Sequence, residues 1–298
     1  MNAFRRADGV YLQIVEGFRQ RILSYRTSVT PKEGWTSADY KAAAAKKQRR
    51  FRRLLAQTQQ WLPSLANTTV LDVGCGDGAN CLQFALEPIR EVVGIDLFLP
   101  INSTDTRGEQ ARALGREILD GKSFPGCLRF QEMDATNMSF PDATFDLVIS
   151  RSAMEHISPT ERVLSEIGRI TKPGGLIYLG IDPFYWARGC HKRGVVDIPF
   201  AHARMNLDDY ARFVEAREDS ATAAKRRRRL ETLNRFTVQQ WREKIEAMPC
   251  EILSWQNKNS EIGENVLAQY PDIPQTLLPC VAITDLLCER IEIWLRRR

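Results

Sequence analysis

The sequence predicts an α/β fold built on a mostly parallel sheet with helices on both faces. Short β-rich runs alternate with helix-like stretches from residue 67 to 182, which is the pattern of parallel strands joined by crossover helices. A glycine-rich turn, Gly74 to Gly78, follows the first run, and a Lys172-Pro173-Gly174-Gly175 turn follows the last helix-like stretch. Glycine and proline end one element and redirect the chain before the next.

Residues 1–66 are predicted to form an N-terminal helical extension. Apolar residues recur every three or four positions, the spacing of one helix face, at Val10, Ile14, Phe18, Ile22 and Tyr25. A second helix is expected to start at a cap on Ser37 and to stop before Pro63. Its basic stretch from Lys46 to Arg53 is expected to be a solvated face, with Phe51 turned inward.

Residues 67–182 are predicted to form the core of the sheet. The five expected strands are TVLDVG, EVVGIDL, LRFQEMDA, FDLVISR and GLIYLGID. Helices are expected between them at about 78–87, 106–120 and 158–171.

The remainder divides into an insertion at 183–235 and a C-terminal segment at 236–298 that completes the sheet. The insertion combines an irregular stretch with a charged helical stretch at about 206–232. After it we expect a helix capped by Thr237, a strand at 251–258 and a final strand from Cys288.

Composition excludes several classes of protein. Hydrophobic residues make up 43% and charged residues 27% of the chain, which argues against a fibre or a wholly disordered chain. The seven cysteines are odd in number and include no C-x-x-C pair, so neither a disulfide framework nor a zinc ribbon is expected. Since no apolar run reaches the ~18 residues of a membrane span, we expect a cytoplasmic protein without a membrane partner.

Charge is distributed unevenly along the chain. Residues 1–66 carry 13 Lys and Arg against 4 Asp and Glu, a net charge of +9. Residues 67–182 carry 10 against 17, or −7, and residues 183–298 carry 19 against 16, or +3. An acidic middle suits a cationic or polyhydroxylic ligand, whereas the basic flanks suit an anionic one or water.

The glycine turn after the first strand is a candidate nucleoside site. Glycines allow a tight turn and let a ligand approach the main chain. Taken alone, Gly74-x-Gly76-x-x-Ala79 also satisfies the dinucleotide fingerprint, so this motif leaves an oxidoreductase open.

Carboxylates at the ends of the next two strands add evidence for a nucleoside site. Asp96 lies 18 residues after Gly78 at a strand end, where it can bind both hydroxyls of a ribose. The third strand ends in Met133-Asp134-Ala135, which offers a carboxylate to an adenine amine and a methionine to its ring. With Phe140-Pro141-Asp142 and the Lys172 turn, residues 67–182 resemble the class I S-adenosylmethionine (SAM)-dependent methyltransferases.

The resemblance implies a Rossmann-like sheet of seven strands, the last antiparallel, with SAM as the cofactor. It implies that the loop around Cys75 wraps the methionine end of SAM and that Asp72 supports the loop and the ligand's ammonium group. Asp96 would hold the ribose, and Asp134 with Ala135 the adenine, while Arg151 would line the floor of the site. The complete set of expected cofactor residues is Asp72, Gly74, Cys75, Gly76, Gly78, Asp96, Leu97, Met133, Asp134, Ala135 and Arg151.

The three histidines all follow the fourth or fifth strand, on the expected reaction side of the sheet. We favour His202 or His191 as a general base with Asp197 as its orienting partner, and His156 as a further candidate that packs beneath the cofactor or faces the acceptor. Two alternatives stay open for the His191–His202 stretch. It could bind a divalent metal, or its polar groups could fix only the shape of the loop. We assign no metal at this point.

The function expected from these residues is methyl transfer from SAM to an oxygen or nitrogen of a small-molecule acceptor, which releases S-adenosylhomocysteine. The basic runs allow that acceptor to be anionic. They also allow a less favoured alternative, an RNA-modifying methyltransferase that uses the N-terminal helix and Lys225 to Arg229. A third hypothesis is a non-catalytic scaffold with the same fold.

Overall fold

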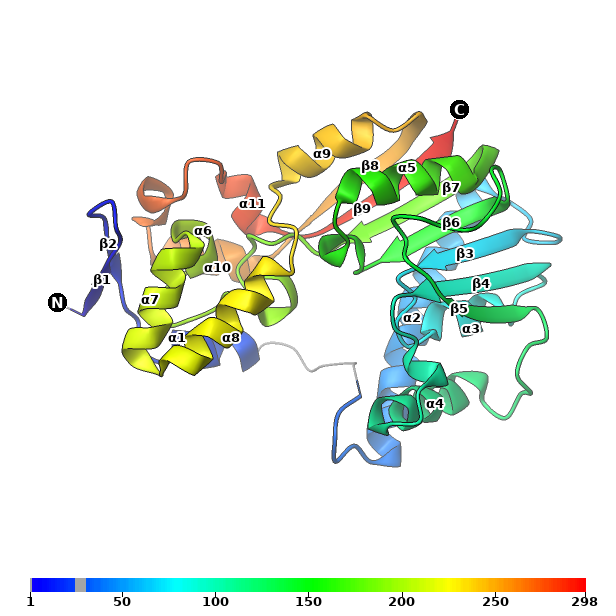
Figure 1. Cartoon of the computed structure of the whole chain (residues 1–298), viewed down its shortest axis with the longest axis horizontal. Coiled ribbons are helices and arrows are strands. Elements are labelled where there is room, and N and C mark those ends of the chain that lie inside the picture. The colour runs from blue at the N-terminus through cyan, green and yellow to red at the C-terminus, as the bar shows by residue number, and fades with distance from the viewer. Residues whose placement is uncertain (1, 25–30) are drawn as a thin grey trace.

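The computed structural model describes residues 2–24 and 31–298, and its centre is a seven-stranded sheet of order β5-β4-β3-β6-β7-β9-β8 (Figure 1). The strands are β3 (Thr69–Val73), β4 (Glu91–Asp96), β5 (Leu128–Glu132), β6 (Phe145–Arg151), β7 (Thr171–Ile181), β8 (Cys250–Asn259) and β9 (Cys288–Arg297). The last strand, β9, runs antiparallel to both of its neighbours, whereas β3 to β7 pair in parallel. The predicted fold class is confirmed.

Helices cover both faces of this sheet (Figure 1). One face packs on α5 (Thr160–Ile170) and α9 (Val238–Glu246), and the other on α2 (Ser37–Trp61), α3 (Ala79–Phe84) and α4 (Thr106–Leu119). Alternate strand residues therefore enter opposite cores: Leu71 packs toward α5, whereas its neighbour Val70 packs toward α2. Burial on both faces explains why the strands are continuously apolar.

Helix α2 starts one residue earlier than its predicted cap. Thr36, not Ser37, is the N-cap: its side chain accepts from Asp39 N, and the Asp39 side chain accepts from Thr36 N at 2.8 Å. This reciprocal pair satisfies amides that the first turn leaves free. The helix ends at Trp61, before Pro63, and buries Phe51 as expected.

The helix predicted from Val10 onward is wrong over its first part. Residues 2–13 form a hairpin, β1 (Ala3–Arg5) against β2 (Tyr11–Gln13), and only α1 (Phe18–Ser24) is helical. Leu12 is buried between two exposed neighbours, the alternation of a strand, and the hairpin turn contains Asp8-Gly9, a dipeptide that favours such turns. Tyr25, the last residue of the predicted stripe, lies outside the described residues.

A second lobe packs beside the sheet and is assembled from three separate stretches, residues 2–24, 183–235 and 260–287 (Figure 1). Its elements besides the hairpin and α1 are η3 (Cys190–Lys192), α6 (Ala201–Arg204), α7 (Leu207–Arg217), α8 (Ser220–Glu231), α10 (Glu261–Gln269), η4 (Ile273–Thr276) and α11 (Ile283–Leu287). The predicted boundaries at residues 66 and 236 therefore do not bound this lobe. Helix α2 packs on the sheet, and residues 260–287 contribute to the core of the second lobe.

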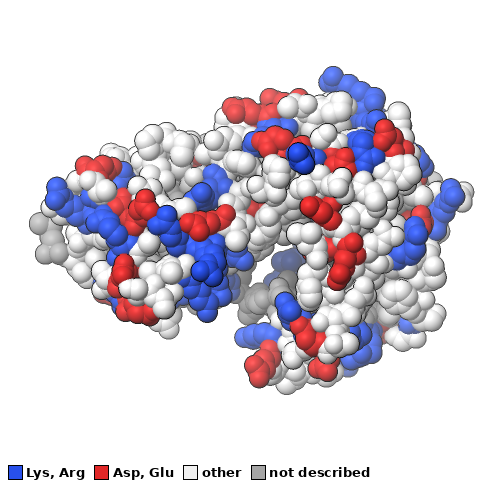
Figure 2. Space-filling model, viewed as in Figure 1, with Lys and Arg blue, Asp and Glu red and all other residues white. Residues whose placement is uncertain are grey.

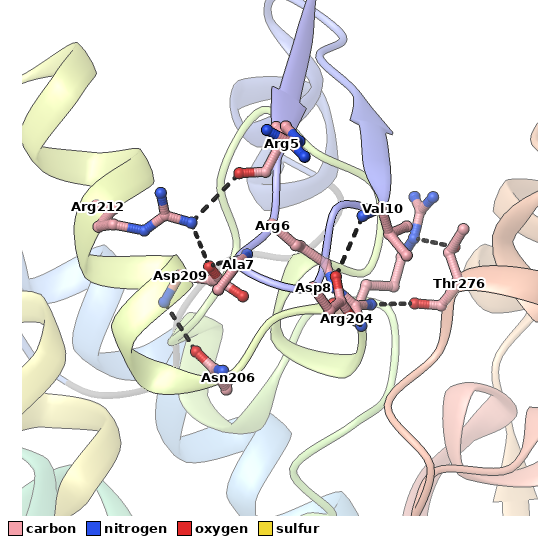
Figure 3. Close-up of polar contacts among 10 residues, drawn as sticks. All are labelled: Arg5, Arg6, Ala7, Asp8, Val10, Arg204, Asn206, Asp209, Arg212 and Thr276. Carbon is pink, nitrogen blue, oxygen red and sulfur yellow. Dashed lines mark hydrogen bonds and ion pairs between the residues drawn. The ribbon is translucent and has the colours of Figure 1, made fainter.

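Two buried arginines join the three stretches of the second lobe (Figure 3). Arg6 Nη1 donates to the backbone carbonyls of Arg204 at 2.7 Å and Thr276 at 2.8 Å. Arg204, only 1% exposed, in turn donates to Pro199 O at 3.1 Å and to Asp272 Oδ2 at 3.1 Å. Because a guanidinium presents five donors in a planar fork, one side chain can serve several segments at once.

Within residues 2–24 and 31–298, every helix is too short or too polar to cross a membrane.

We expect Arg6→Ala to lower the free energy of unfolding by about 2 to 4 kcal/mol, because two carbonyls lose a charged donor. Arg5→Ala is the matched control, since Arg5 is exposed and its loss should cost under about 0.5 kcal/mol. Urea unfolding followed by tryptophan fluorescence measures both. Equal losses in the two variants would contradict a joining role for Arg6.

Candidate functional site

The turn between β3 and α3 is held tightly against β4. Gly74 N and Cys75 N both donate to Ile95 O, at 2.8 and 3.0 Å. Gly74 and Gly78 have φ values of +74° and +73°, which favour glycine. A Cβ at Gly74 would lie 2.3 Å from Ala153 Cβ, and one at Gly78 2.6 Å from Phe130 Cζ. The positive φ favours glycine at both positions, and the contact with Ala153 leaves no room for a Cβ at Gly74.

Asp96, at the end of β4, faces this turn. Its Oδ2 accepts from Gly76 N at 2.9 Å, and its Oδ1 accepts from Phe98 N at 3.3 Å. The parallel register that pairs Val73 with Ile95 brings the two strand ends to the same edge of the sheet. The predicted neighbourhood of the glycine turn and Asp96 is thus present.

Asp72 is a carboxylate buried beneath the turn. It is 1% exposed, and burial raises its pKa to about 7, although hydrogen bonds from Cys81 and Asn80 oppose that rise. The nearby charges of Asp96 and Asp77 raise the pKa further. A carboxylate in such surroundings is stabilised by a cation that enters the site.

An open cleft of about 590 Å³ lies beside the turn. Its walls come from the glycine turn, from α2, from the ends of β6 and β7, from the start of the insertion and from β9. Lys47 of α2 binds Asp77 at 2.8 Å, and Arg290 of β9 binds Asp182 at 2.6 Å and Ser152 Oγ at 3.0 Å. These ion pairs fix the cleft walls, and Arg151 also lines it.

The residues expected around adenine lie near β4 and β5, outside the lining of this cleft. Asp134 is exposed, and its Oδ1 accepts from Thr136 N and Oγ1, both at 2.8 Å. Leu97 is 74% exposed, Met133 is half-buried and Ala135 is buried. Their contact with a cofactor stays a prediction.

The expected pairing of Asp197 with a histidine is absent from the structure. Asp197 Oδ1 accepts from Arg19 N at 2.9 Å, at the start of α1, so this carboxylate serves the N-terminal stretch. The Nε2 of His202 donates to Trp186 O at 2.8 Å, and that of His191 lies 3.1 Å from Glu155 Oε1. Chain contacts from the N-terminus, which the local spacing does not reveal, decide the partner of Asp197.

His191 instead joins a group formed by Glu155, His156 and Cys190, here named the Glu155 cluster. Glu155 and His156 belong to η2 (Met154–His156), directly after β6, and Cys190 and His191 to η3. The two imidazoles stack with centroids 4.8 Å apart. Sequence reasoning missed Glu155, although its position beside His156 was a signal.

The electrostatics of this cluster follow from burial and pairing. Burial raises the pKa of Glu155, which is 1% exposed. Burial alone lowers the pKa of His191, but the hydrogen bond and charge of Glu155 outweigh it and raise that pKa. Loss of water around its ring, together with the charge of His191, lowers the pKa of His156 to about 4.

His202 lies in a different place, against a cavity of about 850 Å³ that is lined mainly by the second lobe, here called the second-lobe cavity. It is 4% exposed, and burial lowers its pKa to about 4, so the ring is neutral. Its Nδ1 has no hydrogen-bond partner within the described part of the chain. His156 lines the same cavity, whereas His191 lines the cleft beside the glycine turn.

The amino-acid sequence is similar to those of known methyltransferases. Residues 71–179 match the family model of the methyltransferase domain. The chain is 31% identical over 147 residues to sterol 24-C-methyltransferase of Pneumocystis carinii, covering 48% of this chain and 36% of that protein. It is 28% identical over 128 residues to 27-O-demethylrifamycin SV methyltransferase of Amycolatopsis mediterranei, covering 43% of each. Residues 71–179 are therefore similar to a methyltransferase domain, and the part of the sheet that they form is called the methyltransferase domain below.

Solved structures extend the likeness of fold to nearly the whole chain. A geranyl diphosphate methyltransferase in complex with SAM aligns with a TM-score of 0.50 at 13% identity, covering 96% of this chain and 97% of that one. The [4+2]-cyclase SpnF aligns with a TM-score of 0.50 at 18% identity, covering 94% and 92%. The chain matches less than half the length of the two sequence relatives above, and a shared fold alone does not fix a reaction.

The basic run Lys225 to Arg229 lies on α8, outside the methyltransferase domain, and its charge is partly neutralised. Arg226 pairs with Glu218. Arg227 pairs with Asp208 at 2.6 Å and with Glu231 at 3.0 Å. These pairs weaken the case for a phosphate-backbone surface, because ion-paired arginines are less available to phosphates.

The burial of Asp72 predicts a pH dependence of stability in the absence of ligand. Its native pKa of about 7 exceeds the ordinary value of about 3.9, so the native state holds the proton more tightly than the unfolded chain. The free energy of unfolding should therefore fall by about 2 to 4 kcal/mol between pH 4 and 7 and then level off.

Asp72→Asn should remove this decrease, and the exposed Asp208→Asn should retain it; urea titrations at a series of pH values measure both. A decrease of unchanged size in Asp72→Asn would assign the effect to another group.

Proposed function

We propose that this protein transfers a methyl group from SAM to a small-molecule acceptor and releases S-adenosylhomocysteine. The observation that carries the proposal is the buried Asp72 carboxylate beneath the glycine turn, with Asp96 beside it. SAM combines an ammonium and a sulfonium group with a ribose, which suits two carboxylates at this edge better than the pyrophosphate of NAD does.

The residues present fit SAM in their chemistry. Asp72 would stabilise the ammonium group, and the amides of the glycine turn would approach the methionine portion. Asp96 would bind the ribose hydroxyls, while Met133, Asp134 and Ala135 would surround the adenine from the end of β5. When bound, SAM supplies an electrophilic methyl carbon, so the chain's main task is to align the acceptor with it and to exclude water.

The acceptor side of the site is cationic. An open hollow of about 350 Å³ adjoins His191 and is lined by five basic side chains: Arg19, Lys192, Arg193, Arg226 and Arg229. One of them, Arg226, is ion-paired with Glu218. No Asp or Glu lines it among the described residues. Figure 2 shows Lys and Arg gathered on the part of the second lobe that faces the methyltransferase domain. We therefore propose that the acceptor carries a carboxylate or phosphate group.

General-base catalysis is a secondary matter for this reaction, because the electrophile is already activated. Of the sequence candidates, His202 lines the second-lobe cavity with a neutral ring whose buried Nδ1 has no hydrogen-bond partner among the described residues, and Asp197 is engaged at α1. His202 would accept a hydrogen bond or a proton from a substrate that reaches this cavity.

Calorimetric titration with S-adenosylhomocysteine tests the cofactor. We expect micromolar binding to the wild type, a loss of about 10- to 100-fold in Asp96→Ala because a charged hydrogen bond to ribose disappears, and no binding of NAD. Asp208→Ala is the matched control and should bind normally. Absence of binding to the wild type would favour a non-catalytic scaffold.

The anionic acceptor is tested by following S-adenosylhomocysteine release with carboxylate- and phosphate-bearing small molecules, each beside its neutral ester or amide. We expect turnover of charged members only. The double variant Arg19→Glu with Arg229→Glu should raise KM about tenfold or more by repulsion, while the affinity for S-adenosylhomocysteine stays unchanged.

Arg162→Glu is the control for this variant, because Arg162 is exposed on α5, away from the hollow. Equal turnover of neutral and charged partners would overturn the anionic assignment and leave the cofactor proposal intact. Turnover of RNA that high salt abolishes would instead support the alternative of an RNA substrate.

A further inference from the structure

The Glu155 cluster brings four metal-binding side chains together. One ligand atom each from Glu155, His156, Cys190 and His191 lies within 4.8 Å of all the others. The set comprises a carboxylate oxygen, two imidazole nitrogens and a thiol sulfur. Two of these residues come from the methyltransferase domain and two from the insertion, so chance proximity along the sequence does not explain the group.

A second observation indicates that something binds inside this group. Glu155 is 1% exposed, and only its Oε1 is engaged, by His191 Nε2 at 3.1 Å. Its Oε2 is fully buried and has no hydrogen-bond partner within residues 2–24 and 31–298. A buried carboxylate oxygen without a partner is costly, and such groups are usually paired or coordinate a metal.

The backbone around the cluster is held in place from both sides. Asn234 Nδ2 lies 2.9 Å from Met154 O and 2.8 Å from Ile157 O, and Asn234 N donates to Glu155 O at 2.7 Å. In η3, Arg193 N donates to Cys190 O at 2.9 Å. A fixed backbone and two stacked imidazoles lower the cost of gathering four ligands around one ion.

We propose that Glu155, His156, Cys190 and His191 bind one Zn²⁺ ion that joins the methyltransferase domain to the second lobe. Nitrogen and sulfur donors with one carboxylate suit Zn²⁺, which favours four tetrahedral ligands, rather than Mg²⁺ or Ca²⁺, which favour oxygen. Four protein ligands leave no open position, so the ion is structural. It fixes the wall between the cofactor cleft, which His191 lines, and the second-lobe cavity, which His156 lines.

Metal analysis of the full chain, purified without a polyhistidine tag, tests this inference directly. After removal of metal with a chelator and reloading with Zn²⁺ alone, we expect about one equivalent per chain, held against dialysis. X-ray absorption should show one sulfur at about 2.3 Å and nitrogen or oxygen ligands at about 2.0 to 2.2 Å. Less than a tenth of an equivalent, or a shell without sulfur, would overturn the proposal.

Variants locate the ion. Cys190→Ser and His191→Ala should each lower the affinity at least tenfold and abolish the rise in melting temperature that Zn²⁺ gives the wild type. Cys280→Ser, at an exposed cysteine, and His202→Asn should retain both. Undiminished binding in the first two variants would place the metal elsewhere and refute the assignment.

These measurements require neither SAM nor an acceptor. The zinc proposal and the proposed methyl transfer can therefore fail separately. The zinc content and the sulfur signal of the wild type test the zinc proposal even if a variant folds poorly.

Discussion

The site depends on the closure of the glycine turn against β4. Two successive amides, from Gly74 and Cys75, share the carbonyl of Ile95, and a third, from Gly76, donates to Asp96. With Ala153 pressed against Gly74, the turn is held by β4 on one side and by the segment after β6 on the other. The open cleft beside the turn lies at the carboxyl ends of the parallel strands, where we propose that SAM binds.

Two nearly inaccessible carboxylates give this region its chemical character. Asp72 lies beneath the turn and Glu155 follows β6, and both are 1% exposed with pKa values raised by burial. A buried carboxylate is costly unless it is paired, and His191 contacts only one of the two carboxylate oxygens of Glu155. The proposed ammonium group of SAM and the proposed Zn²⁺ ion provide such partners by different chemistry. Under these two proposals, ligand binding would stabilise the folded chain.

The second lobe supplies what the methyltransferase domain lacks, a cationic surface and a separate cavity near the reaction side. Its three stretches are joined by Arg6 and Arg204 rather than by chain continuity. Asn234 then connects the lobe to η2. Under the proposed function, the methyltransferase domain would bind the cofactor and the added lobe would select the acceptor.

The sequence by itself determined the α/β core, because strand runs, helix periodicity and the glycine turn are local signals. It also determined that Asp72 and Asp96 share one edge, since parallel strands end together. Tertiary structure alone decided the partners of the histidines: His191 meets Glu155, 36 positions away, and Asp197 turns to Arg19. It likewise decided which stretches form the second lobe. Such contacts depend on how distant elements pack against one another, which residue spacing and composition do not predict.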